Sequence, residues 1–230
     1  YDKTPRLSNC EDEINEYIDS HFNTVIEKEY ITKDGKKYRE TRIKEICDKL
    51  RVLGIYGQVK QNKKLPKLIF NCKKEDVCEL IGGIFDTDGY ISNPKNKTKH
   101  VIVLTSAYKE LLDEISLLLL KIGVHGKIRF IKPNLKNPKD KNGYYRLEIA
   151  DTKSLISFIN NITFYPKEKQ RRLESYKETL KNQKSEISKY IHGIRFERVI
   201  SIEDIGIKKV YNLTAEGTHT YIVNGIITKN

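Results

Sequence analysis

Hydrophobic residues recur along this chain with two different spacings, and the spacing separates helices from strands. Apolar positions three and four residues apart predict a series of helices, over residues 10–27, 42–52, 75–85, 106–122, 152–161 and 166–184. Short runs rich in β-branched residues predict a series of strands, near 90–91, 101–104, both sides of 132–143, 199–202, 210–213, 221–223 and 226–227. Lys33-Asp34-Gly35 predicts a tight hairpin, Ser106 a helix cap, and Gly54 and Gly123 helix ends.

The order of these elements changes near residue 185. Residues 75–165 run helix, strands, helix, strands, helix, and 30–60 look like a shorter version of that order. After a charged helix, the pattern becomes purely β from Phe196 onward. We therefore predict an α+β unit over 1–184, a linker over 185–192 and a separate β segment over 193–230.

Charge and cysteine content narrow the partners and the compartment. The 230 residues carry a net charge of +12, with Lys and Arg spread along the chain. A dispersed basic surface favours a nucleic-acid partner, although a genome rich in Lys, Ile and Asn would also produce it. The cysteines, which form neither a CxxC pair nor a zinc pattern, indicate structural thiols in a reducing compartment; they are Cys10, Cys47, Cys72 and Cys78.

Features at the level of the whole chain predict a soluble, intracellular protein without a membrane partner. No apolar run approaches the ~20 residues that cross a bilayer, and no signal peptide opens the sequence. The chain contains no Met, so Tyr1 is not a translation start. We expect both ends to be cuts in a longer polypeptide.

The end of the predicted helix at 75–85 carries an unusual set of residues, Gly82-Gly83-Ile84-Phe85-Asp86-Thr87-Asp88-Gly89. Carboxylates at a helix C-terminus are disfavoured by ~0.3–1 kcal/mol each, and a divalent cation would offset this cost. Each helical glycine costs ~1 kcal/mol relative to Ala, which suits a site where another backbone packs closely. The alternative is an ordinary Asp-Gly turn with incidental glycines.

This segment, Ile81 to Gly89, resembles the LAGLIDADG motif of homing endonucleases. Further blocks that resemble the same family occur in the expected order, at Lys63–Phe70, Leu104–Ser106, Leu120–Gly123 and Tyr145–Ile149. The resemblance implies an αββαββα repeat that is complete over 63–184 and only partial over 1–62. It also implies a Mg²⁺-dependent double-strand DNA endonuclease.

The same resemblance suggests roles for individual residues. Asp88 matches the acid that binds the metal ion at the scissile phosphate, and Asp86 matches a less directly catalytic acid. Lys63 would stabilise charge at the phosphate or order water there. Basic strand residues such as Lys127 and Arg129 would face double-stranded DNA, although a solvated surface is the ordinary interpretation of any one of them. Because the chain holds one motif where a single-chain enzyme needs two, the partner helix is expected before Tyr1.

The last strands, from Val210 to the terminal Asn230, resemble the final two conserved blocks of inteins, which belong to a Hint-type all-β splicing domain. The resemblance makes Asn230 the residue that cyclises and cleaves the following peptide bond, with His219 managing the proton. Lys229 stands where His is usual, and Asn212 where Asp is usual. The Asn-Gly turn at 224–225 would bring the chain end back beside the preceding strand. The alternative is an ordinary β-hairpin with a surface His and no catalytic role.

Together these patterns predict the C-terminal part of an intein with an attached endonuclease module. Splicing needs no cofactor, and the chain shows no leading Cys or Ser and no Thr-x-x-His. It would therefore require an N-terminal intein fragment that supplies the nucleophile and the first motif, together with a flanking extein. The alternatives are a homing endonuclease with a relic splicing segment and an inactive basic DNA-binding module.

Overall fold

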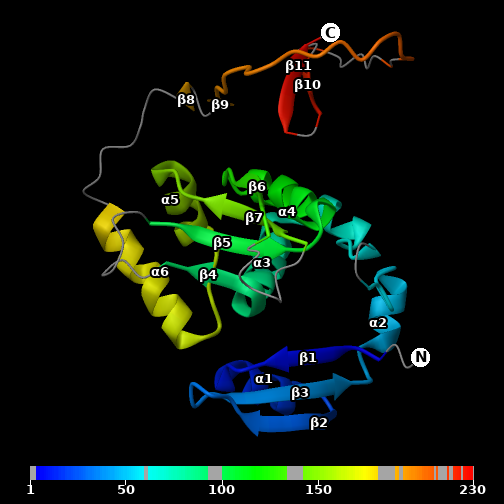
Figure 1. Ribbon diagram of the computed structural model, residues 1–230, viewed down its shortest axis with the longest axis vertical. Helices are drawn as coiled ribbons and strands as arrows, with labels where there is room; N and C mark the ends of the chain where they lie inside the picture. The colour runs from blue at the N-terminus through cyan, green and yellow to red at the C-terminus, as the bar shows by residue number, and fades with distance from the viewer. Residues whose placement is uncertain are drawn as a thin grey trace. The chain divides into compact units, whose positions relative to one another are not determined.

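A computed structural model describes most of the chain, namely residues 4–59, 62–92, 100–133, 142–180, 190–191, 194–209, 211, 217, 220–223 and 225–229. Contacts divide the chain into a larger unit, Tyr1–Gln183, and a smaller unit, Lys184–Asn230. The larger unit combines helices with antiparallel sheets, whereas the described residues of the smaller unit form only short strands (Figure 1). None of the helices in the described part is long and apolar enough to cross a bilayer.

Residues 62–180, the four-stranded part, contain an antiparallel sheet of order β4-β5-β7-β6. Its strands are β4 (Gly89–Ile91), β5 (Ile102–Ser106), β6 (Lys127–Ile131) and β7 (Tyr144–Ile149). Its helices are η2 (Lys67–Asn71), α3 (Lys74–Asp88), α4 (Lys109–Lys121), α5 (Thr152–Asn161) and α6 (Lys167–Leu180). The register pairs Leu104 of β5 with Leu147 of β7, so both face the helices.

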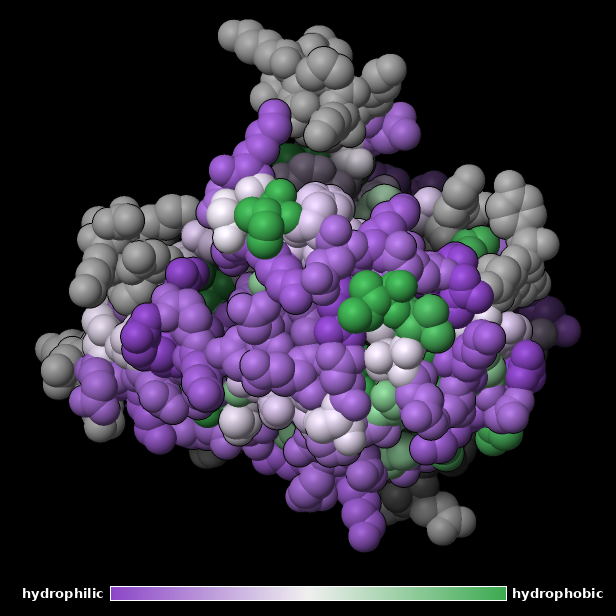
Figure 2. All heavy atoms as spheres, turned by 90° about the horizontal axis from the view of Figure 1, so that it is seen from below, coloured by the Kyte–Doolittle hydropathy of each residue, from purple (hydrophilic) through white to green (hydrophobic). Residues whose placement is uncertain are grey.

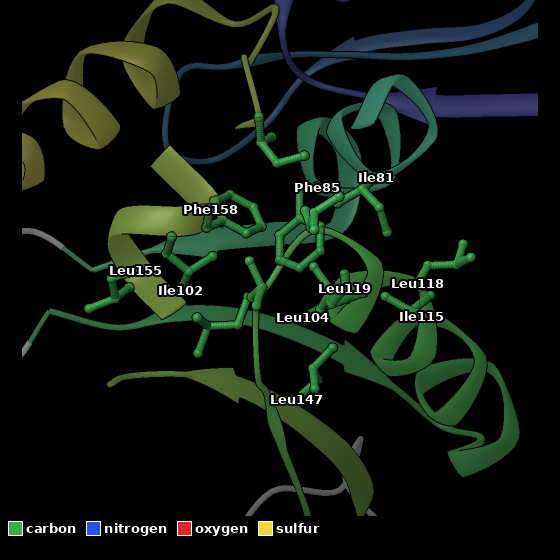
Figure 3. Close-up of a cluster of buried hydrophobic side chains, with 14 of the residues drawn as sticks. Ile81, Phe85, Ile102, Leu104, Ile115, Leu118, Leu119, Leu147, Leu155 and Phe158 are labelled. Atoms are coloured by element: carbon green, nitrogen blue, oxygen red, sulfur yellow. The ribbon is translucent and has the colours of Figure 1, made fainter. Parts of the chain in front are cut away.

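One hydrophobic core fills the space between this sheet and its helices. Figure 3 shows side chains from α3, α4, α5, β5 and β7 converging, among them Phe85, Leu119, Leu104 and Phe158. The Phe85 and Phe158 rings meet edge to face with centroids 5.2 Å apart, an arrangement that adds to the gain from burial. This core fixes α3, and with it the acidic end of the helix.

Residues 4–59, the three-stranded part, form a smaller version of the same plan. The strands β1 (Arg6–Asn9), β2 (Thr24–Ile31) and β3 (Lys37–Ile43) pair in the order β1-β3-β2, with α1 (Asp12–His21) and α2 (Cys47–Val52). The order β1-α1-β2-β3-α2 repeats β5-α4-β6-β7-α5, with β1-β3-β2 matching β5-β7-β6. Viewed from the side of the three-stranded part, the surface is mostly hydrophilic with small, separate apolar patches (Figure 2).

The smaller unit has two short hairpins in its described residues. They are formed by β8 (Tyr190–Ile191) with β9 (Ile194–Arg195), and by β10 (Thr220–Val223) with β11 (Ile226–Lys229). Gly225 has a φ of +80° at the tip of the second hairpin, where a tight two-residue turn needs a left-handed residue. Large apolar side chains between the hairpins are exposed, including Val199, Ile200, Ile202 and Ile207.

The structure confirms many predicted elements and corrects others. The helix at 152–161, the strands flanking 132–143 and the hairpin at Gly35 are confirmed. The helix predicted over 10–27 is wrong at its end: α1 stops at His21, and the β-branched run from Thr24 enters β2. The prediction that Ser106 caps α4 is also wrong, because Ser106 ends β5 and Tyr108 is the residue before the helix.

Two further predictions are wrong for reasons of pairing. The helix predicted over 42–52 begins only at Cys47, because Ile43 is the last residue of β3 and is paired with Thr24. The strand predicted at 199–202 is not formed, and within the described residues no neighbouring strand offers it backbone hydrogen bonds. The strand predicted at 210–213 falls almost entirely outside the described residues.

Candidate functional site

The acidic end of α3 is the first element of the candidate site. α3 continues through Asp88, and one side of the helix (Val77, Ile81 and Phe85) is buried in the core. The helical period then leaves Asp86 half-buried and Asp88 exposed at the last residue. The fold thus presents one carboxylate to solvent and holds the other against the protein.

Asp86 is held by residues from the far end of the four-stranded part. The Tyr165 backbone N–H donates to Asp86 Oδ1 at 3.1 Å. Lys169 of α6 donates from Nζ to the carbonyl oxygens of Phe85 at 3.0 Å and Asp86 at 2.5 Å. Burial raises the pKa of Asp86, while the Tyr165 N–H and the Lys169 charge oppose that rise. A cation at the negative end of a helix is stabilising, so Lys169 offsets part of the cost of two carboxylates there.

Lys169 was not among the residues singled out from the sequence. Burial lowers its pKa, and the nearby carboxylates Glu11, Asp86 and Asp88 raise it again. In the sequence it is one of several lysines on a charged helix, so no local signal distinguishes it. The contact with α3 depends on tertiary packing across 84 residues.

The glycines of α3 face a hollow of about 500 Å³ between α1 and α3. A Cβ at Gly82 would lie 3.1 Å from the Thr163 carbonyl oxygen, so close backbone approach does explain this glycine. A Cβ at Gly83 would meet nothing within 4 Å. Apolar side chains of β1 and α1 line the other side of the hollow, namely Leu7, Ile14, Tyr17 and Ile18.

The acidic end of α3 is better suited to a metal ion that a phosphate group also ligates than to one held by protein side chains alone. Among the described residues, no three His, Cys, Asp or Glu side chains are grouped to hold a metal ion. Magnesium, however, is often held by one or two carboxylates, with phosphate oxygens and water completing its shell. The exposed carboxylate of Asp88 fits that arrangement, whereas Asp86 is engaged by Tyr165.

The basic candidates come from two places in the four-stranded part. Lys63 is exposed in the segment before η2, and Lys127 and Arg129 are exposed on β6. Arg129 lies opposite Arg146 in the sheet, and Lys127 opposite Glu148. These strand residues are on the face away from the helices, because Ile128 between them packs against the core.

The candidates of the C-terminal strands can be placed only in part. Lys229 is the last residue of β11 and pairs with Thr220 of β10. His219, Asn230 and Asn212 lie outside the described residues. The hairpin itself has the predicted turn, with Val223 opposite Ile226.

Known proteins match this chain in two ways. Residues 75–163 match the family described as "LAGLIDADG-like domain". The chain is also 33% identical over 197 residues to the probable translation initiation factor IF-2 of Methanocaldococcus jannaschii, a match covering 83% of this chain and 16% of that protein. It is 30% identical over 193 residues to the ribonucleoside-diphosphate reductase NrdEB subunit alpha of Bacillus subtilis, covering 78% and 17%.

A third relative is the replicative DNA helicase DnaB of Rhodothermus marinus, 28% identical over 119 residues, with 51% of this chain and 12% of that protein covered. The chain therefore spans about one sixth of the length of the first two relatives. The antiparallel sheets and helices of the larger unit are consistent with the matched family. The match over residues 75–163 supports a module of the homing-endonuclease type in this part of the chain.

Proposed function

We propose that this chain is the C-terminal portion of an intein that carries a DNA endonuclease module. One observation carries the proposal: relatives named as a translation factor, a reductase subunit and a helicase share this segment, which occupies 12–17% of each. A translation factor, a reductase subunit and a helicase share no reaction that would require the same domain. A segment inserted into different hosts, and able to leave them by splicing, accounts for the pattern.

The smaller unit supports the splicing half of the proposal. Its apolar side chains are exposed, among them Ile200 and Ile207, as expected for a segment whose covering strands belong to another fragment. Asn230 would attack its own backbone carbonyl through its side-chain nitrogen. A succinimide forms, the bond to the following residue breaks, and the departing amine takes a proton. His219 would manage that proton, with Lys229 and Asn212 at the adjoining positions of the site.

The acidic end of α3 supports the endonuclease half. Asp88 would hold a magnesium ion, which polarises a phosphate and lowers the pKa of a bound water. Asp86 and Lys169 would fix the end of the helix, so that the Asp88 carboxylate stays in place. Lys63 would supply positive charge for the phosphate, and the sheet faces with Lys127 and Arg129 would bind the DNA duplex.

The hollow between α1 and α3 supports the need for an upstream fragment. Its lining includes apolar side chains of β1 and α1 as well as polar ones, and the open Gly83 leaves room for a second helix rich in small residues. In the described residues the three-stranded part has no counterpart of α3. The upstream fragment would bring that helix and a second carboxylate for the other DNA strand.

The test of the splicing half is reconstitution with the polypeptide encoded directly upstream, using short flanking segments and intact-mass spectrometry. We expect ligated flanks from the parent chain. Asn230→Ala should abolish release of the C-terminal flank, and Thr228→Ala, two residues away, serves as the matched control. A mixture that forms a stable complex but gives no ligated product contradicts the splicing proposal.

A homing endonuclease with a relic splicing segment is the second candidate, favoured by the family match over residues 75–163. Cleavage of a plasmid library with Mg²⁺ that is lost in Asp88→Asn, without peptide chemistry at Asn230, would support it. Asp113→Asn, an exposed acid on α4 paired with Lys109, is the matched control. Salt-dependent DNA binding without either reaction would instead indicate an inactive basic DNA-binding module.

A further inference from the structure

The helix-free face of the four-stranded sheet contains a carboxylate among basic side chains. Leu147 and Ile149 of β7 point into the core, so the alternating residues Arg146 and Glu148 are on the opposite face. Glu148 lies opposite Lys127 of β6, two residue pairs along the ladder from the Arg129–Arg146 pair and therefore on the same face. An acid on a surface proposed to bind DNA weakens the attraction to phosphates, so its presence needs an explanation.

Glu148 divides its two oxygens between two arginines. Oε1 lies 3.0 Å from Arg146 Nε, and Oε2 lies 3.7 Å from Arg129 Nε. The carboxylate side chain is 21% exposed, whereas those of Arg146 and Arg129 are 35% and 63% exposed. The carboxylate is thus more covered than either arginine side chain.

The two guanidinium groups keep their hydrogen-bonding capacity. Neither the Arg129 nor the Arg146 side chain donates a hydrogen bond to any residue that the structure describes, and Arg146 Nε is buried without an acceptor of suitable geometry. Their contacts with Glu148 are ion pairs only. The ion pairs with Glu148 use only the two Nε atoms, so the terminal nitrogens of both guanidinium groups are suited to acceptors supplied by a ligand.

The three-stranded sheet contains a similar arrangement. Glu27 accepts hydrogen bonds from Arg6 Nε at 2.5 Å and from Arg42 Nε at 2.6 Å, and these bonds lower the pKa of Glu27. Arg6 and Arg42 lie directly opposite each other on β1 and β3. Opposed like charges destabilise a sheet, and in both sheets a partly covered glutamate lies between the two arginines.

We propose that Glu148 is a positioning residue that determines DNA specificity on this sheet face. It would hold Arg129 and Arg146 side by side for the O6 and N7 acceptors of guanine, the commonest specific contact of arginine in the major groove. Its negative charge would also weaken attachment to phosphates, which carry no sequence information. The inference rests on the proposed DNA-cleaving function and adds to it the residue that restrains binding to arbitrary DNA.

The test measures duplex binding by the full chain, with Glu148→Gln compared with Glu110→Gln, an exposed acid on α4. The probes are one duplex of arbitrary sequence and a pool of duplexes with random sequence. For Glu148→Gln we expect tighter binding to the arbitrary duplex and a salt slope steeper by about one unit. The ratio of its affinity for the arbitrary duplex to that of the parent should therefore fall about fourfold between 50 and 200 mM salt.

Selection from the random pool supplies the second readout. The parent chain should enrich guanines, and Glu148→Gln should enrich them less while its urea unfolding midpoint stays unchanged. Glu148→Asp, which keeps the charge, should retain weak binding to the arbitrary duplex. Equal affinity and equal base preference in Glu148→Gln and the parent would overturn the inference. A parent chain that binds no DNA at any salt concentration would overturn the proposed endonuclease function as well.

Discussion

The four-stranded part buries its large apolar side chains, whereas the smaller unit leaves many of its own exposed. In the four-stranded part, Phe85, Leu119 and Phe158 are buried at 1% exposure or less. In the smaller unit, Ile200, Ile202 and Ile207 are at least 91% exposed. Both regions are rich in strand-forming residues, so composition does not explain the difference.

This difference in burial indicates which apolar surfaces are covered by the chain's own helices and strands. The four-stranded part has helices that cover one face of its sheet, whereas the described strands of the smaller unit have no covering layer within that unit. The three-stranded part is intermediate, with only Ile14 and Ile43 buried among its apolar side chains. We infer that the first region folds on its own core and that the smaller unit is completed by another fragment.

The largest expected effect compares one phenylalanine from each region. Phe85→Ala removes a ring that is 1% exposed, and we expect it to lower the free energy of unfolding by about 3–5 kcal/mol. Phe196→Ala removes a ring that is 55% exposed, and its effect should stay within about 0.5 kcal/mol. Urea unfolding followed by circular dichroism measures both. Equal losses would show that the smaller unit has a core of its own.

The next effect concerns the contact that fixes the acidic end of α3. Lys169→Met removes a charged donor from the carbonyls of Phe85 and Asp86, and we expect a loss of about 1–2 kcal/mol because hydrogen bonds to charged groups are strong. Lys167→Met, an exposed lysine on the same helix, should change stability little. If the two variants unfold at the same urea concentration, Lys169 does not hold the site in solution.

A smaller effect of opposite sign distinguishes the two glycines of α3. Gly83→Ala should stabilise the chain by up to about 1 kcal/mol, because the position is open and Ala favours helices. Gly82→Ala should not stabilise the chain, because its Cβ would crowd the Thr163 carbonyl oxygen. Thermal unfolding gives both values. In the reconstituted complex, Gly83→Ala should reduce DNA cleavage if a second helix packs there, and unchanged cleavage would contradict that packing.

The smallest effect is a pH dependence from a partly buried histidine of the four-stranded part. Burial lowers the pKa of His100, whose ring contacts Tyr176 edge to face at 4.4 Å. The unfolded chain therefore binds the proton first, and stability should fall as pH drops through about 6.5. His100→Phe keeps an aromatic ring and should reduce the fall between pH 7 and 5 by less than about 1 kcal/mol. Identical pH profiles for parent and variant would contradict this assignment.

Local patterns predicted the elements that depend on local chemistry. The helix at 152–161 has an apolar face and an Asp151 cap that accepts from Ser154 N at 3.0 Å. The acidic end of α3 was also visible in the sequence. Lys169 was not, because its role depends on contact with a segment 84 residues away. The strand predicted at 199–202 was wrong: its apolar pattern is present, but none of the strands that the structure describes pairs with it.

The chain is proposed to hold halves of two independent sites, and one experiment tests that claim most directly. The parent chain, Asp88→Asn and Asn230→Ala are each combined with the upstream polypeptide, and each sample is assayed for plasmid cleavage with Mg²⁺ and for ligated flanks by mass spectrometry. We predict that Asp88→Asn loses DNA cleavage and still splices, whereas Asn230→Ala loses splicing and still cleaves DNA. Loss of neither reaction in either variant, or absence of both reactions in the parent, would contradict the account.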